Sequence, residues 1–589
     1  MNMNRINGTG TEEHNYFIRR MFRRQYMPAL ISALTLSLGD MADAIVLGRR
    51  MGEVGLAAMS FALPIFMIYN VIMHSFGLGG SMNFSRHMAA GHEEKARADF
   101  QGVFTFLILI GAAIAVLGNL AIQPILFVLG AGESHTLLYD TTAVYVRILL
   151  ISAPLFFSAY SLGYYMRNCD MEREAGIAAS VGNIVDIILN VVLVFFLRMG
   201  AAGAGIATLA GVALTSAIEI VVIRCRKNAL RLLPFKPDYS NVWKCFRTGF
   251  STCVSYLYKL VFVLLCNNII IRLAGEEGVA VFDVIQNLTY FFSYIYGAVT
   301  QAVQPILSTY SQEYNHEACD LAERKGFFVG MVTGLAVTAL VAVFAPEVCA
   351  VFGLSPENGG TLGTWAIRVF CTGTLLTGIN HLWGEFSLAR GQSLPTFVLS
   401  TLRGAAVLIP LTLLCSQFGA KFFWTVFPLT EAVSLAIFLL WRKLKYVDNG
   451  QIEPERVYRA FLHNQLEEIG TVTEQIEAFC ERWEATPKQH YYVQMTVEEL
   501  CNVIMTKGFQ GKEADECMIQ ISLVAGKDGK FTLHLRDSSD TFNPFAFSAD
   551  KSDGEDIDFN EVGMQVIKKR AESFYYRRYQ EFNTMVVTI

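Results

Sequence analysis

The chain has 589 residues, of which 53% are hydrophobic and 17% are charged, and its mean hydropathy is +0.38. These values exclude an ordinary soluble enzyme and indicate a protein of the lipid bilayer with many membrane-spanning helices. The net charge of -5 excludes little, because the distribution of Lys and Arg among the loops sets the orientation of such a protein. A net charge of this sign and size gives no indication of a nucleic-acid partner.

Residues 1–20 contain neither an apolar segment nor a small-residue cleavage site, so we expect a short cytoplasmic N-terminal segment and no cleaved signal peptide. Twelve later segments are long and apolar enough to cross a bilayer as helices, which takes about 20 residues each. The predicted spans are 28–48, 55–80, 99–121, 141–165, 175–197, 202–223, 249–272, 279–305, 326–352, 363–388, 394–416 and 420–441.

Lys and Arg gather in alternate loops between these spans. The central loop, residues 224–248, contains seven of them, whereas the opposite loops contain few besides Arg49 and Arg50. Because basic residues favour the cytoplasmic side, we expect both termini in the cytoplasm of a cell with the chain in its inner (plasma) membrane.

The membrane region contains an internal repeat. With an offset of about 223, GEVGLAAMS (52–60) aligns with GEEGVAVFD (275–283), and GHEEKA (91–96) aligns with NHEACD (315–320). Six spans are thus duplicated, and an even number gives both copies the same orientation. The sequence predicts two parallel six-helix lobes, 21–223 and 249–445, which is an arrangement typical of transporters.

Polar residues inside the apolar spans are the candidates for chemistry. Asp43 lies in the first span, where a carboxylate costs roughly 2.5 to 3.5 kcal/mol on insertion scales. In the fifth span Asn183, Asp186 and Asn190 share one helix face, and Thr208 follows in the sixth. Such oxygen atoms suit a proton or a hard cation. The alternative is that the amides join helices by hydrogen bonds and that Asp43 caps a helix or pairs with a neighbour.

These residues resemble a known family. Asp43 to Gly48 ending the first span, LAA...LP opening the second and FSRHMAAGHEEKAR (84–97) after it look like multidrug and toxic compound extrusion (MATE) transporters. The resemblance implies that Asp43 is a cation or proton site, with H⁺ or Na⁺ as the coupling ion and Asp43 and Asp186 as sodium ligands if sodium is used. Archaeal-type members carry Asn and then Asp in the fifth span, whereas this chain has Asp186 and then Asn190; Thr208 matches the family threonine.

The second lobe has no carboxylate at the position equivalent to Asp43, so we assign ion coupling to the first lobe. Asp283, Glu385 and Glu431 are its candidate acids, each of which also fits an interfacial position. Aromatic and amide side chains that would suit an organic cation by stacking and cation–π contact are Tyr256, Asn267, Asn268, Tyr290, Phe291, Phe292, Tyr294 and Tyr296. The alternative is that this aromatic run packs a core or faces lipid.

Residues 450–589 change to a charged, mixed composition that predicts one cytoplasmic α+β two-layer domain. Helical patterns cover 454–483, 491–505 and 560–572, and strand patterns cover 517–525, 530–537 and the last segment, NTMVVTI. The order resembles the anti-sigma-factor branch of the histidine-kinase-like ATPases. The residues that match its nucleotide-binding positions are Glu498, Asn502, Asp537 and Gly563.

Departures from that family argue against ATP and Mg²⁺ binding. Ser539 stands where the family has glycine, and Asn560, Glu561 and Val562 precede Gly563 where a phosphate loop needs residues without Cβ atoms. The sequence therefore favours a degenerate regulatory or protein-binding module, with a cytoplasmic protein as its partner, over a kinase.

Taken together, the sequence predicts a secondary antiporter that exports organic, amphipathic and cationic compounds, and not an enzyme. One alternative is a membrane receptor whose transporter-like part binds a ligand and whose tail signals. A second is a flippase of lipid-linked sugars, which would need a cationic cavity; Lys259 is one of few cations in the spans.

Overall fold

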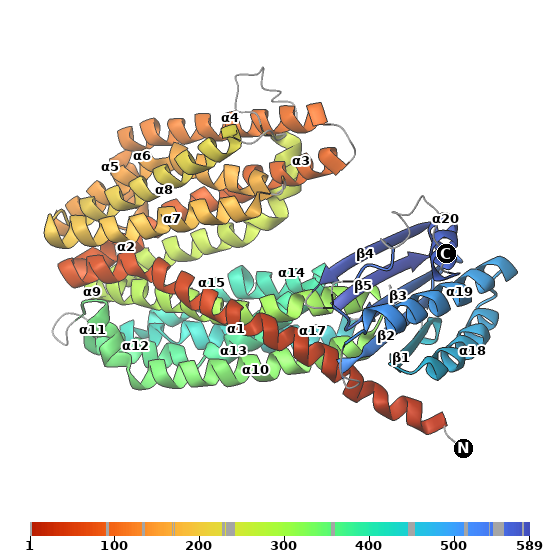
Figure 1. The fold of residues 1–589 in the computed structure, drawn as a ribbon. Helices are drawn as coiled ribbons and strands as arrows, with labels where there is room; N and C mark the ends of the chain where they lie inside the picture. Colours follow the sequence, from red (N-terminus) through yellow and green to blue (C-terminus); the bar gives the residue numbers. More distant parts are fainter. Residues whose placement is uncertain are drawn as a thin grey trace.

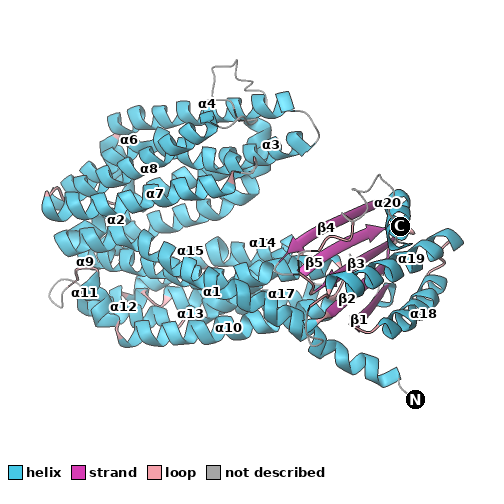
Figure 2. Cartoon of the chain, viewed as in Figure 1, coloured by secondary structure: helices cyan, strands magenta, loops and turns pink. Residues whose placement is uncertain are grey.

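The computed structural model contains a large helical part followed by a small domain built on a β-sheet (Figure 1, Figure 2). It describes residues 3–89, 93–131, 136–167, 169, 171–225, 230, 242–354, 360–445, 454–511, 516–540, 542–545, 559–579 and 582–589. The predicted central loop and the linker before the tail lie largely outside these residues.

The first half of the membrane part consists of helices joined by short turns in its described residues. Its elements are α1 (Met3–Met51), α2 (Glu53–Ile72), the π-helix η1 (Met73–Leu78), α3 (Gly79–Ala89), α4 (Glu93–Leu120), α5 (Ile122–Leu129), α6 (Thr136–Arg167), α7 (Glu172–Val191), the π-helix η2 (Val192–Phe196) and α8 (Ala201–Cys225).

The second half is also helical. Its elements are α9 (Val242–Gln312), α10 (His316–Val343), α11 (Ala345–Val351), α12 (Thr361–Cys371), α13 (Thr374–Ala389), α14 (Ser393–Thr401), the π-helix η5 (Leu402–Ala406), α15 (Leu408–Cys415), η6 (Ser416–Phe418), α16 (Ala420–Phe423) and α17 (Val426–Lys445).

Nine helices among the described residues are long and apolar enough to cross a membrane, or up to ten if the bent pair α12 and α13 forms one span. The predicted number of twelve is therefore not confirmed. Part of the difference comes from α9, which covers two predicted spans that meet at a kink at Gly275, where the backbone is not helical. The last predicted span, α17, is not among the nine and carries Glu431 and three basic residues near its end.

The sequence repeat has a counterpart in the backbone. Gly52 and Gly275, 223 residues apart, both have φ near +60° (62° and 64°), a conformation that glycine adopts without strain. Gly130 and Gly353 are the same distance apart and have φ of 100° and 84°. The helices that follow the aligned GHEEKA and NHEACD motifs, α4 and α10, are each 28 residues long.

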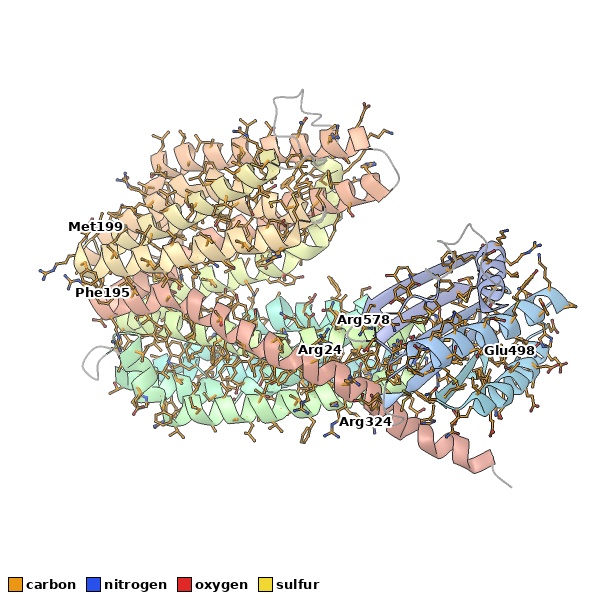
Figure 3. All side chains as sticks on the ribbon, viewed as in Figure 1. Arg24, Phe195, Met199, Arg324, Glu498 and Arg578 are labelled. Carbon is orange, nitrogen blue, oxygen red and sulfur yellow. The ribbon has the colours of Figure 1, made fainter. Side chains whose placement is uncertain are left out.

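The two halves touch closely at the end farthest from the sheet domain and diverge toward it (Figure 1). At the closed end a Cβ atom on Gly353 would lie 2.1 Å from the Gly48 carbonyl oxygen, so only glycine permits this backbone contact. Figure 3 shows Phe195 and Met199 at that end, whereas Arg24 and Arg324 lie near the sheet domain. Arg24 and Arg324 thus lie on the side that carries the tail, whereas Arg49 lies at the closed end, where it donates to the Val351 carbonyl.

The tail folds as one antiparallel sheet with helices on one face (Figure 2). Its strand order is β1-β2-β3-β5-β4. The elements are η7 (Pro454–Arg456), β1 (Val457–His463), α18 (Leu466–Arg482), α19 (Pro487–Val503), the π-helix η8 (Ile504–Gly508), β2 (Met518–Ala525), β3 (Phe531–Asp537), α20 (Phe559–Arg570), β4 (Ser573–Tyr579) and β5 (Phe582–Thr588).

The predicted two-layer α+β class agrees with this structure, but two elements differ. Residues 457–463 form strand β1 where a helix over 454–483 was predicted, and β4 was missed. In β1 the sequence VYRAFLH alternates only weakly, and a short apolar run does not distinguish the two periods. Residues 457–463 form a strand because they pair with β2, from Val457 opposite Val524 to His463 opposite Met518.

The second face of the sheet packs on the membrane part instead of facing solvent. Phe17 of α1 lies against Phe582 and Phe461 of the sheet, with ring centroids 4.8 and 6.5 Å apart. Arg536 of β3 forms an ion pair of 2.7 Å with Glu313, just after α9, and both side chains are only 3% exposed. Gln520 of β2 accepts hydrogen bonds from Arg536 and from Tyr310 of α9, which fixes the sheet on the end of this helix.

Candidate functional site

Asp43 and Asn190 meet between α1 and α7. The Asn190 side chain is fully buried, and its amide Nδ2 donates a hydrogen bond to Asp43 Oδ1. The Asp43 carboxylate is therefore held inside the first half of the molecule. The sequence predicted both residues as site members, and the structure brings them together from helices 147 residues apart in sequence.

Asp186 lies one turn from Asn190 on α7 and interacts electrostatically with Asp43. Its Oδ1 is buried and has no hydrogen-bond partner in the structure. Together with Asn183 it lines a cavity of about 230 Å³ between α6, α7 and α8. Thr208 does not line this cavity, and its hydroxyl donates to the Ala204 carbonyl of its own helix.

The donor set at this place fits a proton or a small hard cation. Asp186 Oδ1 and Asn190 Oδ1 are both buried oxygen atoms without a hydrogen-bond partner, and Asp43 adds a second carboxylate. Hard cations take such carboxylate and amide oxygens as ligands. Among the described residues no group of three or more His, Cys, Asp or Glu side chains could hold a metal ion.

The site also approaches the second half of the chain. The buried Tyr145 of α6 is within electrostatic range of Asp43, Asp186 and Asp283, the last of which comes from α9. Asp283 is only 1% exposed and accepts a hydrogen bond of 3.1 Å from Asn287. It is thus a core residue and not an interfacial one.

Glu431, another of the predicted second-half acids, forms an ion pair with a neighbouring arginine. Arg403 of η5 donates to both of its carboxylate oxygens at 2.8 and 2.7 Å, and Asn380 of α13 adds a bond of 2.6 Å. This bidentate geometry is typical of a strong, stable ion pair. Glu385, on α13 as well, is half-buried.

The aromatic residues predicted for a substrate cavity have other contacts. The Lys259 ammonium lies 5.6 Å from the Tyr256 ring centroid and 5.5 Å from that of Tyr290, so an internal cation already occupies these faces. Phe291 packs edge-on against the buried Phe292, Tyr296 is buried and bonds the Thr374 carbonyl, and Tyr294 is half-buried.

The two predicted amides of this cavity join helices. Asn267 is fully buried, accepts a hydrogen bond from the Ser60 hydroxyl and donates one to the Ser60 carbonyl. Asn268 donates to the carbonyls of Val128 and Leu264. Both side chains thus link α9 to the first half by hydrogen bonds between helices.

The adenine end of the predicted nucleotide site is preserved. Asp537 is fully buried, its Oδ1 accepts hydrogen bonds from Ser539 and Asn583, and its Oδ2 has no partner in the structure. Burial raises the pKa of this carboxyl above its ordinary value, and the bonds from Ser539 and Asn583 oppose the shift. A buried oxygen without a donor fits the amino group of an adenine ring.

The phosphate end does not fit. Gly563 of α20 packs on the side chain of Glu499, whose carboxyl carbon would lie 2.4 Å from a Cβ atom at this position. An acid at that place repels a phosphate. Glu498 is exposed on α19 (Figure 3), and Asn502 is half-buried on the same helix. Residues 546–558 between Asp537 and Gly563 lie outside the described residues, so we derive no step through ATP or Mg²⁺.

Sequence reasoning missed two groups of buried charges. Glu219 of α8 is 2% exposed and lines the same cavity as Asp186; its spacing of four from Thr215 was the available signal. The Arg536–Glu313 pair joins residues 223 positions apart, which no local pattern reveals.

Comparisons with known proteins agree with both parts of the resemblance. The MatE family matches residues 28–192, and the histidine kinase-like ATPase domain matches residues 462–589. Residues 28–192 are thus similar to the MatE family, and residues 462–589 are similar to the histidine kinase-like ATPase domain.

Several curated relatives cover the membrane part. The probable multidrug resistance protein YoeA of Bacillus subtilis is 22% identical over 437 residues, which are 71% of this chain and 93% of the relative. The multidrug export protein MepA of Staphylococcus saprophyticus is 22% identical over 70% of this chain and 91% of its own length, and MepA of Staphylococcus aureus is 23% identical with the same coverage.

Solved structures share the fold. An inward-facing multidrug resistance MATE family transporter of the MOP superfamily superposes with a TM-score of 0.63, at 21% identity, over 71% of this chain and 97% of the other. Its outward-facing counterpart gives 0.55 at 22% identity, and the MATE multidrug transporter DinF-BH in complex with a rhodamine dye gives 0.57 at 22%, each over 72% of this chain and 95% of the other. The helical part thus has the MATE transporter fold, and these likenesses do not favour the receptor or the flippase.

Proposed function

We propose that this chain is a secondary antiporter that exports amphipathic organic compounds in exchange for H⁺ or Na⁺ by alternating access. In this proposal it crosses the inner membrane twelve times as two parallel six-helix repeats, with both termini in the cytoplasm. The basic residues near the tail, the repeated glycine conformations and the named relatives support this arrangement.

The observation that carries the proposal is the cluster of Asp43, Asp186 and Asn190 inside apolar helices. Two carboxylates that repel each other in such a place gain from binding a cation, because a buried charge without a partner is costly. An ion that enters from outside neutralises them and lets α1 and α7 pack closer. Its release toward the cytoplasm restores the repulsion, and this difference between the two states drives the exchange.

The substrate class follows from a second cavity. A space of about 770 Å³ lies between α2, α4, α5, α6 and α9 and is lined by apolar side chains, among them Ile65, Leu117, Leu150 and Leu264. Pockets for drug-sized ligands span about 300 to 1,000 Å³ and are mostly apolar. We place the apolar part of the exported compound there and use the rhodamine dye bound in one related structure as the probe.

For the tail we propose a regulatory or protein-binding role without phosphotransfer. The docking of its sheet on α1 and α9 gives it a route to the helix that carries Asp43. The acid beside Gly563 argues against a working phosphate site.

Efflux of the rhodamine dye from a strain that lacks its own pumps tests the proposal. We expect wild type to lower dye accumulation, Asp43→Asn and Asp186→Asn to abolish the effect, and a truncation after Lys445 to change its rate but not its ion dependence. Equal accumulation with and without the wild-type chain, at matched expression, would rule out export. Binding of the dye without movement would instead favour a receptor.

A further inference from the structure

Glu219 is a buried acid that the coupling site described above does not use. It lies on α8, near the end that leads toward Arg224 and away from the closed contact between the halves. Its side chain is 2% exposed, and Oε2 has no hydrogen-bond partner in the structure. An acid buried in this way among apolar helices needs a ligand or a function.

The cavity of about 230 Å³ connects Glu219 to Asp186. Along α8, Gly211, Thr215 and Glu219 face it at intervals of four residues, and α7 contributes Asp186 at one end. Gly211 packs against Asp186, since a Cβ atom there would lie 2.8 Å from the Asp186 Cβ. Glu219 follows eight residues later, which is about 12 Å along the helix.

A distance of two helical turns is too long for direct proton transfer between the two carboxyl groups. The cavity has room for several water molecules, because each takes up about 30 Å³ in the liquid. Tyr160, Tyr164 and Thr215 line it, and hydroxyl groups of this kind hydrogen-bond to water.

Arg167 marks the other end of the cavity. It is the last residue of α6, is exposed, and interacts electrostatically with Glu219. The cavity therefore leads from Asp186 to a positive charge at the surface of the protein. The remaining titratable groups at the cavity are Asp186, Tyr160 and Tyr164, and Arg173 and Glu174 lie at the same end of α7.

From this geometry we propose that Glu219 is a second proton acceptor for transport, which takes the coupling proton from Asp186 through water in the cavity and releases it beside Arg167. Asp186 returns to the carboxylate as Glu219 becomes the neutral acid, and Glu219 then loses the proton to solvent. The inference rests on the proposed antiport and names the route of its ion.

Transport by the full chain in proteoliposomes tests the route. We expect Glu219→Gln to slow movement of the rhodamine dye driven by a pH gradient by roughly tenfold or more, as for the loss of a positioned proton-transfer group. Exchange of labelled for unlabelled dye, which needs no net ion movement, stays within about twofold, and Glu219→Asp recovers part of the driven rate. The matched control is Glu94→Gln, an exposed acid of α4. Equal driven rates for Glu219→Gln and Glu94→Gln overturn the proposal.

If the wild-type chain moves no dye, the antiport proposal fails. A second measurement then still tests whether Glu219 accepts a proton. Dicyclohexylcarbodiimide, a reagent for protonated carboxyl groups in apolar surroundings, is applied to the purified chain and the labelled residues are identified by mass spectrometry. We expect labelling of Glu219 that decreases as the medium becomes alkaline and is insensitive to sodium. Absence of labelling at acidic pH, or protection by sodium at constant pH, overturns the assignment of Glu219 as a proton acceptor.

Discussion

The two halves of the membrane part treat their buried acids differently. In the first half Asp186 and Glu219 each keep a carboxylate oxygen without a hydrogen-bond partner. In the second half Glu431 is bound by Arg403, and Glu313 is bound by Arg536 of the tail. The first half thus presents acids that gain from binding an ion, whereas Glu431 and Glu313 of the second half are already neutralised by arginine. Asp283 of the second half departs from this contrast, because it is buried and accepts a hydrogen bond from Asn287.

The largest expected effect is a loss of stability when the buried ion pair of Arg536 and Glu313 is broken. Arg536→Met leaves Glu313 buried without a partner, which lowers the stability of the docked state by about 3 to 5 kcal/mol. Thermal unfolding of the full chain and amide hydrogen exchange at residues 310–316 measure this loss. The double variant Glu313→Leu and Arg536→Met removes both charges and is expected to regain most of it. A double variant as unstable as the single one would show that the pair is not the cause.

The next largest effect is expected when an arginine is placed beside a buried acid of the first half, as Arg403 lies beside Glu431 in the second half. Asn183→Arg places a guanidinium three residues before Asp186 on the same helix face, in the cavity. It neutralises Asp186, so ion-driven efflux of the rhodamine dye falls about 100-fold, the scale for losing one proton-transfer group. Asn183→Gln is the control and retains efflux. Normal ion dependence in the arginine variant would contradict a coupling role for Asp186.

A smaller effect is expected where an acid is already paired. Arg403 and Glu431 are 25% and 14% exposed, so Glu431→Gln lowers the free energy of unfolding by roughly 2 kcal/mol, between the values for surface and buried pairs. Efflux by folded protein keeps its ion dependence because the coupling site is untouched. If this variant instead lost coupling at unchanged stability, the contrast between the halves would be wrong.

The smallest effect is a pH dependence of docking. His534 of β3 lines the cavity between the sheet and α9, and burial lowers its pKa below the ordinary 6.5, while the charge of Glu313 opposes the shift. The undocked state binds more protons than the docked one below pH 6.5, so docking is strongest above that value and weakens on acidification. Hydrogen exchange at residues 310–316 as a function of pH tests this, and His534→Gln is expected to remove the dependence. An unchanged profile in that variant would exclude His534.

The sequence predicted the class of both domains and named Asp43 and Asn190 as candidate site residues, which the structure joins by a hydrogen bond. An acid in an apolar helix and a polar stripe with a period of four are local signals. The sequence did not predict that the Lys259 ammonium lies over the rings of Tyr256 and Tyr290, or that Asn267 is hydrogen-bonded to Ser60. These contacts depend on how α9 bends and on which helices it meets. Glu219 escaped notice because a charge six residues before the end of a span resembles an interfacial residue.

Helix α1 is long enough to connect the ion site directly to the sheet domain. Phe17, packed on the sheet, and Asp43, at the ion site, belong to the same helix, which contains Pro28 between them, and are separated by 26 residues, or about 39 Å. A rotation of only about 5° about the Asp43 end would carry the Phe17 end through about 3 Å. Ion binding at the Asp43 carboxylate can therefore displace the sheet domain by a distance comparable to the width of an atom. A molecule that binds the sheet domain can in turn restrain the movement of α1.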